Sequence, residues 1–146
     1  VPYPSEAEEH AILARTTGSS DAQVPRVLGG EALLRLQRHV REVHVGDTLM
    51  AWINRLVRST RPTEGASDEV RNWVRWGAGP RAGQSLVLAA KARALMHGRL
   101  AATREDVAAL AAPVMRHRLL LSFAAEAERI STDDVIARVL QQHPAP

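Results

Sequence analysis

The stretch Gly77-Ala78-Gly79-Pro80-Arg81-Ala82 decides how this chain is interpreted. Its two glycines and its proline predict a sharp turn, and about sixteen residues with helical spacing follow it and end near Gly98. The first turn of a helix presents unpaired backbone N–H groups and a partial positive charge. An arginine placed there can bind an anion, and phosphate suits its forked guanidinium best. From composition alone, however, an ordinary surface charge is the favoured interpretation of Arg81.

The composition around this stretch favours one small helical domain. The chain has 146 residues, of which 45% are hydrophobic and only 3% aromatic, so its core is aliphatic. The absence of cysteine excludes disulfides and thiolate metal sites and indicates a cytoplasmic location. A net charge of +3 permits a nucleic-acid partner without requiring one. No apolar run reaches the roughly 18 residues that cross a bilayer, so no membrane partner is expected.

Capping signals and helical periodicity predict an all-α fold, a small helical bundle with room for one short pair of extended segments. Ser5 and Glu8 form a capping box, Asp47 is expected to cap a later helix, and Pro113 is expected to kink or divide another. Residues 68–76 fit either a short helix or an extended segment. The predicted helices begin near residues 5, 30, 47, 81, 103 and 131.

The central helix, predicted over residues 81–97, has an apolar row along one face. Leu88, Ala92 and Leu95 recur at helical spacing and make that row. A second set of small side chains is expected to let neighbouring helices approach closely: Ala89, Ala90 and Ala94.

No catalytic or metal-binding pattern can be defended within the chain. It has no P-loop, no HExxH and no helical pair of metal-binding histidines. We interpret His97 and His117 as capping or partly buried residues. The acidic pairs Glu105-Asp106 and Asp133-Asp134 fall in first helical turns, where the helix dipole accounts for them.

Two alternative functions remain open from the residues alone. The segment from Arg71 to Trp76 mixes arginine with tryptophan, and together with Arg116 it could bind single-stranded nucleic acid. The same tryptophans more often close the edge of a core, and the chain has no dense basic face. The second alternative is a protein-interaction module that exposes apolar patches.

The motifs taken together resemble the C-terminal lid of MoxR-family AAA+ ATPases. The turn is followed by Leu88-Ala89-Ala90-Lys91-Ala92-Arg93-Ala94 and by Gly98-Arg99. The resemblance continues through Thr103-Arg104-Glu105-Asp106-Val107 and Val114-Met115-Arg116-His117-Arg118-Leu119, and it includes the opening Tyr3-Pro4-Ser5. It covers nearly the whole chain.

The resemblance implies that Arg81 is the sensor 2 arginine, which reaches the terminal phosphates of a bound nucleotide. Gly77, Gly79 and Pro80 would form the supporting turn, although the family usually has serine where this chain has Gly79. The resemblance assigns residues 1–146 to the lid and places ATP and Mg²⁺ on a core domain that these residues lack. We therefore expect no tightly bound cofactor and no ATPase activity in the chain alone.

The same resemblance implies how the complete protein works. The start at Val1, without methionine, indicates a piece of a longer protein, with a core–lid hinge at or before Val1-Pro2. The expected partners are the protein's own AAA+ core and neighbouring subunits of a hexameric ring. A protein with a von Willebrand A domain is a further expected partner, and the expected role is that of a chaperone-like or maturation factor.

Overall fold

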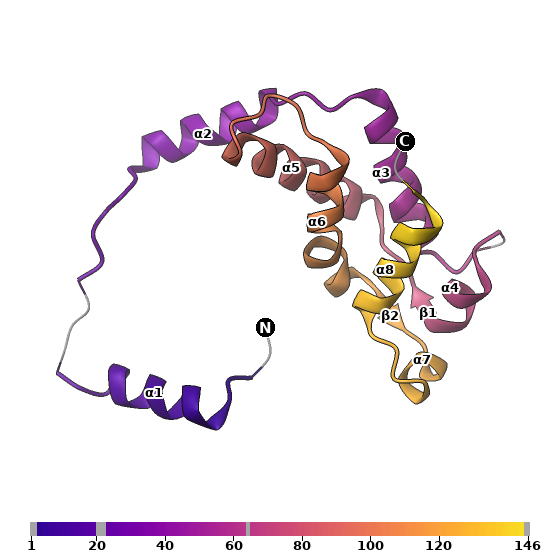
Figure 1. Cartoon of the computed structure of the whole chain (residues 1–146), viewed down its shortest axis with the longest axis horizontal. Coiled ribbons are helices and arrows are strands. Elements are labelled where there is room, and N and C mark those ends of the chain that lie inside the picture. The colour runs from indigo at the N-terminus through magenta and orange to yellow at the C-terminus, as the bar shows by residue number, and fades with distance from the viewer. Residues whose placement is uncertain (1–2, 20–22, 64, 145–146) are drawn as a thin grey trace. The chain divides into compact units, whose positions relative to one another are not determined.

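The computed structural model describes residues 3–19, 23–63 and 65–144 (Figure 1). The predicted hinge at Val1-Pro2 lies outside these residues. The chain forms two compact units, residues 1–33 and residues 34–146, and each is described by itself.

The first unit contains α1 (Glu6–Thr16) and the start of α2 (Gly30–Glu42). The predicted capping box is confirmed, because the Ser5 backbone N–H donates to Glu8 Oε2 at 2.8 Å and the Ser5 hydroxyl oxygen accepts from the Glu8 N–H at 3.5 Å. No residue of α1 is buried. The helix therefore owes its form to its cap and to its acidic first turn rather than to a core.

The second unit contains the rest of α2 and the other elements, with a short 3₁₀ turn (Arg116–Arg118) after α6. The end of α2 is tied to the far end of α5, because Lys91 Nζ donates to the Arg41 carbonyl oxygen at 2.8 Å. His44 forms a parallel bridge with Ala101. The remaining elements are α3 (Asp47–Ser59), α4 (Asp68–Trp73), β1 (Val74–Trp76), α5 (Pro80–Met96), α6 (Arg104–Met115), β2 (Leu120–Leu121), α7 (Phe123–Ala127) and α8 (Thr132–Gln142).

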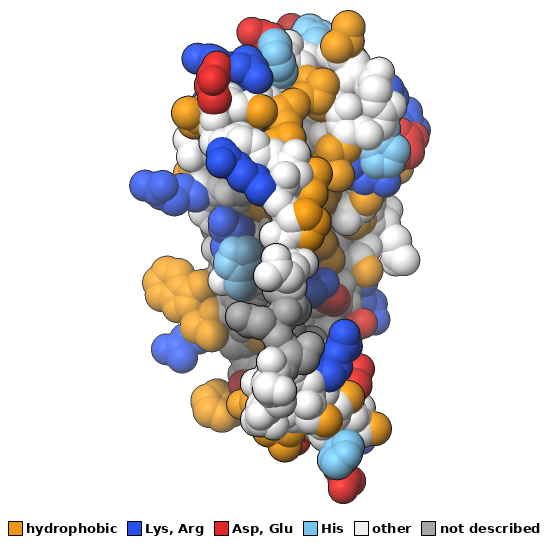
Figure 2. All heavy atoms as spheres, turned by 90° about the vertical axis from the view of Figure 1, so that its left-hand side faces the viewer, with side chains coloured by type: hydrophobic (Ala, Val, Ile, Leu, Met, Phe, Trp, Pro, Cys, Tyr) orange, Lys and Arg blue, Asp and Glu red, His pale blue; other side chains and the backbone are white. Residues whose placement is uncertain are grey.

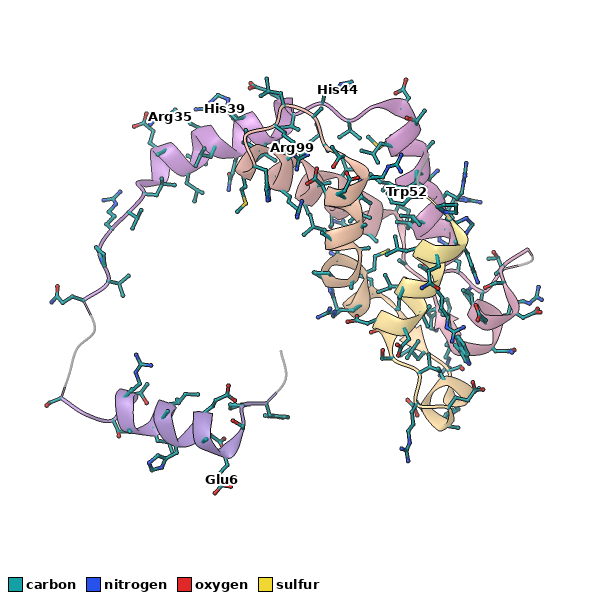
Figure 3. The ribbon with its side chains drawn as sticks, viewed as in Figure 1. Glu6, Arg35, His39, His44, Trp52 and Arg99 are labelled. Carbon is teal, nitrogen blue, oxygen red and sulfur yellow. The ribbon has the colours of Figure 1, made fainter. Side chains whose placement is uncertain are left out.

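The core lies among α3, α5, α6 and α8. On α3 the buried residues are those that the sequence predicts, from Leu49 to Val57. Trp52 reaches the end of α8, where its Nε1 donates to the His143 carbonyl oxygen at 2.8 Å (Figure 3). Among the described elements, the most extensive contact is that of α5 with α6. The fully buried residues of these two helices are Ala82, Leu86, Ala90, Ala94, Val107, Ala111 and Met115.

The apolar row predicted on α5 is not the buried one, whereas Ala90 and Ala94 of the predicted small residues are fully buried. Leu86, rather than Leu88, is fully buried, and Leu88 is 40% exposed. Ala92 and Leu95 are only half-buried. The physical reason is the packing of α6, which meets a row with one large side chain, Leu86 among three alanines, rather than the predicted row with two leucines.

Two predictions of helix boundaries also need correction. Asp47 does not cap α3, because Gly46 occupies the N-cap position and Asp47 is the first helical residue, where its carboxylate still favours the helix dipole. Pro113 does not divide α6, which runs on for two residues beyond it. A proline so close to a helix end disturbs little of the hydrogen-bond ladder.

Residues 68–76 adopt both of the forms that the sequence left open. Ser67 caps α4, and the chain then becomes extended as β1, which pairs antiparallel with β2 through Val74–Leu121 and Trp76–Leu120. The prediction of an all-α bundle with one short extended pair is confirmed.

Candidate functional site

The turn before α5 is held against the end of α3 by backbone contact. A Cβ atom on Gly77 would lie 2.4 Å from the Thr60 carbonyl oxygen and 2.6 Å from the Cα of Arg61. Glycine is therefore required at residue 77 by close approach, because both neighbours are backbone atoms that cannot move aside. This contact sets where α5 begins.

A short hydrogen-bond chain completes the anchoring of the turn. The buried Thr60 hydroxyl accepts from the Ala78 N–H at 2.9 Å and donates to the Val57 carbonyl oxygen at 2.7 Å. Arg61 Nε donates to the Ala78 carbonyl oxygen at 3.0 Å. Ala78 itself is fully buried. Both backbone polar groups of Ala78 are thus satisfied, which fixes the turn's orientation.

Arg81 stands on this anchored turn at the surface. Gly79 is the N-cap and Pro80 the first residue of α5. Arg81 follows, exposed, and within the part of the chain that the structure describes no hydrogen bond or ion pair engages its side chain. The first turn of α5 has no acidic residue. Positive charge at this helix start is therefore not neutralised locally, as an anion site requires.

Gly79 plays a different part from Gly77. A Cβ at this N-cap would meet nothing within 4 Å, and the residue's φ of −86° suits any amino acid. Serine, which the MoxR-like motif usually has here, would therefore fit without rearrangement. The departure from that motif leaves the turn geometry intact and removes one N-cap hydroxyl.

A buried ionic cluster at the other end of α5 was missed by the sequence analysis. Asp106 is fully buried, and its carboxylate accepts hydrogen bonds from Arg99 at 2.6 and 2.7 Å and from Arg93 at 2.7 Å. Thr103 adds its backbone N–H and hydroxyl, at 2.9 and 3.1 Å. Arg99 lies at the corner between α5 and α6 (Figure 3). Its guanidinium holds the pKa of Asp106 well below the usual range.

The only signal for this cluster in the sequence was the spacing from Thr103 to Asp106, which is that of a helix cap. The capping interaction is present. The arginine partners, however, come from the preceding helix and from the loop after it. The explanation of Asp106 by the helix dipole alone was therefore incomplete.

The two tryptophans of the Arg71–Trp76 segment have different roles. Trp73 closes the edge of the core: it is 9% exposed, its Nε1 donates to Glu128 Oε2 at 2.9 Å, and the Arg138 guanidinium lies 4.8 Å from its ring centre. Trp76 is 67% exposed, opposite Leu120 on β2.

The arginines proposed for nucleic-acid binding are largely neutralised. Arg71 pairs with Asp68, and Arg116 makes two hydrogen bonds to Asp133, at 2.8 and 3.1 Å. Only Arg75 of the three has no such partner among the described residues. This arrangement disfavours a phosphate-binding face built from them.

The two histidines singled out from the sequence do not form a metal site. His97 Nδ1 lies 2.8 Å from the Arg93 carbonyl oxygen, which fits the predicted capping role at the end of α5. His117 is exposed, so its prediction as partly buried is wrong. Across residues 3–19, 23–63 and 65–144, no group of three or more metal-binding side chains comes together. Nor is any helix in these ranges long and apolar enough to span a membrane.

Comparison with known proteins shows which family this chain belongs to. The model of the AAA lid domain family matches residues 67–139, which include the anchored turn, α5 and the Asp106 cluster. This chain belongs to the AAA lid domain family. The match begins at the cap of α4 and ends within α8.

The relatives of this AAA lid domain include MoxR proteins. Chaperone MoxR1 of Mycobacterium tuberculosis is 38% identical over 147 residues, covering 100% of this chain and 39% of MoxR1. Protein MoxR of Paracoccus denitrificans is 50% identical over 56 residues, covering 38% of this chain and 16% of that protein. The predicted resemblance to MoxR lids is confirmed.

A solved structure shares the fold of the lid domain. The crystal structure of a candidate ATPase from Cytophaga hutchinsonii superposes with a TM-score of 0.84 at 27% identity, covering 100% of this chain and 45% of that one. The chain spans less than half the length of these relatives.

Proposed function

We propose that the chain is the helical lid of a MoxR-like AAA+ ATPase and that Arg81 is its sensor 2 residue. In this proposal the lid covers a nucleotide held mainly by a separate core domain, and Arg81 reaches the terminal phosphates. The observation that carries the proposal is an exposed guanidinium, without a partner among the described residues, on an anchored helix start.

The Arg81 side chain and the first turn of α5 have the charge and the hydrogen-bond donors that binding of a phosphate group needs. The guanidinium forks to two oxygens and stays charged at any physiological pH. The first turn of α5 adds backbone N–H donors and no competing carboxylate. Because Gly77 and Ala78 tie the turn to α3, a phosphate that pulls on Arg81 would move the whole lid rather than one loop.

The same proposal includes the cofactors, the assembly and the partners of the complete protein. ATP and Mg²⁺ would be bound by the core domain, with Mg²⁺ and the core supplying the chemistry of phosphate cleavage. The complete protein would act as a chaperone-like or maturation factor in the cytoplasm and assemble into hexameric rings. Its partners would be its own core, neighbouring subunits and a von Willebrand A domain protein. The MoxR names of the relatives support this setting.

The test is ATP hydrolysis by the complete protein carrying Arg81→Ala. Arginines that act on a transferring phosphoryl group from across an interface contribute about 10³–10⁵ in rate, and a sensor arginine should contribute at least about tenfold. Arg75→Ala, which removes another exposed arginine six residues before Arg81, is the matched control and should leave turnover unchanged. Equal turnover in the two variants and the unmodified protein would refute the role of Arg81.

A further inference from the structure

The three basic residues that follow α6 have three different surroundings. Arg116 is paired with Asp133, and His117 is exposed. Arg118 instead reaches α5, where its Nη2 donates to the Ser85 hydroxyl oxygen at 3.3 Å. Of the three residues, Arg118 is therefore the one that adds a positive charge to the side of α5.

The charge of Arg118 has no counter-charge among the described residues. Its hydrogen bonds go to two neutral oxygens, the Ser85 hydroxyl and the Val114 carbonyl near the end of α6, and no ion pair involves it. These bonds use two of the five N–H donors of a guanidinium, so donors remain for an anion. Because Arg118 is half-buried, its charge is less well hydrated than that of a fully exposed arginine, and it gains more from an anion beside it.

Ser85 places Arg118 on the same face of α5 as Arg81. Residues four apart lie about 6 Å apart along a helix axis and about 40° apart around it, so they are neighbours on one face. The order of contacts agrees, because α5 and α6 run antiparallel: Arg93 meets Asp106 at one end of the pair, and Ser85 meets Arg118 at the other. The end of α6 thus brings a second arginine to the first turns of α5.

Positive charge is otherwise spread thinly over the chain. The formal net charge is only +3. On the face drawn in Figure 2, Lys and Arg side chains are scattered among hydrophobic and other side chains rather than gathered into one patch. Binding of a multiply charged anion therefore depends on particular arginines that the fold brings together, and Arg81 and Arg118 are such a pair.

We propose that Arg118 contacts the phosphate group next to the terminal one in the nucleotide whose terminal phosphate Arg81 reaches. This inference rests on the proposed function and adds a second binding residue to the same site. Two guanidiniums held one helical turn apart suit neighbouring phosphates of one chain better than a single phosphate. Arg81 then contacts a group that ATP has and ADP lacks, whereas Arg118 contacts a group that both nucleotides have.

Equilibrium titration of the complete protein with ATP and with ADP tests the proposal. Arg118→Gln should weaken the binding of both nucleotides by about tenfold or more, because a charge-assisted contact is lost. Arg118→Lys keeps the charge without the fork and should lose less. Arg116→Gln is the matched control, since Asp133 already neutralises that arginine, and it should bind both nucleotides like the unmodified protein.

Two further measurements separate phosphate binding from a purely structural role, in which Arg118 only caps the end of α6. Ser85→Ala removes the hydroxyl that orients Arg118 and leaves its bond to Val114, so it should weaken both nucleotides by about threefold. Added salt should weaken nucleotide binding less steeply in Arg118→Gln than in the unmodified protein, because one charge contact is absent. Loss of a cap alone would change neither quantity. Circular dichroism melts check that each variant is folded.

The outcomes for Arg81 and Arg118 are distinguishable. If Arg81→Ala loses ATP affinity but Arg118→Gln binds both nucleotides normally, only the role of Arg118 is overturned. A loss that Arg116→Gln shares, a loss confined to ATP, or an unchanged dependence on salt in Arg118→Gln would overturn it as well. An Arg81→Ala variant with unchanged ATP affinity would refute the proposed function itself, whatever Arg118→Gln shows.

Discussion

At the scale of single residues, Gly77 and Gly79 have different structural roles in the turn before α5. Gly77 is fixed by backbone atoms of Thr60 and Arg61, whereas Gly79 borders open space. The sequence predicts the turn from both glycines together, since glycine is common in turns whatever the reason. The sequence cannot show that the two glycines have different roles, because the atoms that crowd Gly77 belong to residues 60 and 61, which are distant in the chain.

Substituting each glycine separately should show this difference. Gly77→Ala should lower the free energy of unfolding by at least about 2 kcal/mol, because the added methyl overlaps rigid backbone. Gly79→Ser should change it by no more than about 0.5 kcal/mol, since a serine N-cap differs little from glycine. Urea unfolding monitored by circular dichroism measures both. A similar loss in both variants would contradict the anchoring described for the turn.

Asp106 is the residue on which acid stability depends most clearly. Its pKa is depressed below the ordinary value of 3.8, mainly by the hydrogen bonds from Arg99. The folded state therefore binds fewer protons than the unfolded state near that pH. Its contribution to stability is complete above about pH 5 and is lost as the pH falls below about 4.

Asp106→Asn should remove the contribution of the Asp106 carboxylate to folding stability, and with it the pH dependence of that contribution. The variant leaves Arg93 and Arg99 without a counter-charge, which should cost roughly 2 to 4 kcal/mol at neutral pH, since the two arginines are about one-third exposed and partly hydrated. Between pH 5 and pH 3 the stability of the variant should fall less steeply than that of the unmodified chain. Parallel pH profiles for the two proteins would argue against this assignment.

At the scale of elements, the helices could be predicted well and their inward faces less well. Caps at Ser5 and Ser131 and the periodic stripe of α3 are local signals, and the structure confirms them. On α5 several apolar rows compete, so periodicity alone could not choose between Leu86 and Leu88. The choice depends on how closely α6 approaches, which is a property of tertiary packing.

Truncating these two leucines one at a time tests the observed orientation of α5. Leu86 is fully buried, so Leu86→Ala should cost about 2 to 5 kcal/mol. Leu88 is 40% exposed, so Leu88→Ala should cost no more than about 1 kcal/mol. Thermal or urea unfolding gives both values. The reverse order would mean that α5 turns its other row inward.

At the scale of the whole molecule, the candidate site could be predicted only in part. The sequence gives the order of the motifs, and hence Arg81, the supporting turn and the lid family. It gives neither Thr60 nor Arg61 as a hydrogen-bond partner of Ala78. Both arise where α3 meets α5, through contacts between residues about 17 or more positions apart that local patterns do not encode.

The geometry also says how a nucleotide signal would travel through the lid. Arg81 is joined to α3 through the turn, and α5 is joined to α6 along its row of small side chains and through the Asp106 cluster. A force applied at Arg81 would therefore displace these helices together. If the proposed function holds, this rigid-body movement would be a hinge closure of the lid against the core.

The most direct test of the central claim compares the affinities of the complete protein for ATP and ADP, with and without Arg81→Ala, by equilibrium titration. If Arg81 reaches the terminal phosphate, the variant should lose about tenfold or more in ATP affinity and far less in ADP affinity, because each charge-assisted contact contributes about 1.5–3 kcal/mol. Equal losses for both nucleotides, or no loss for either, would contradict the account.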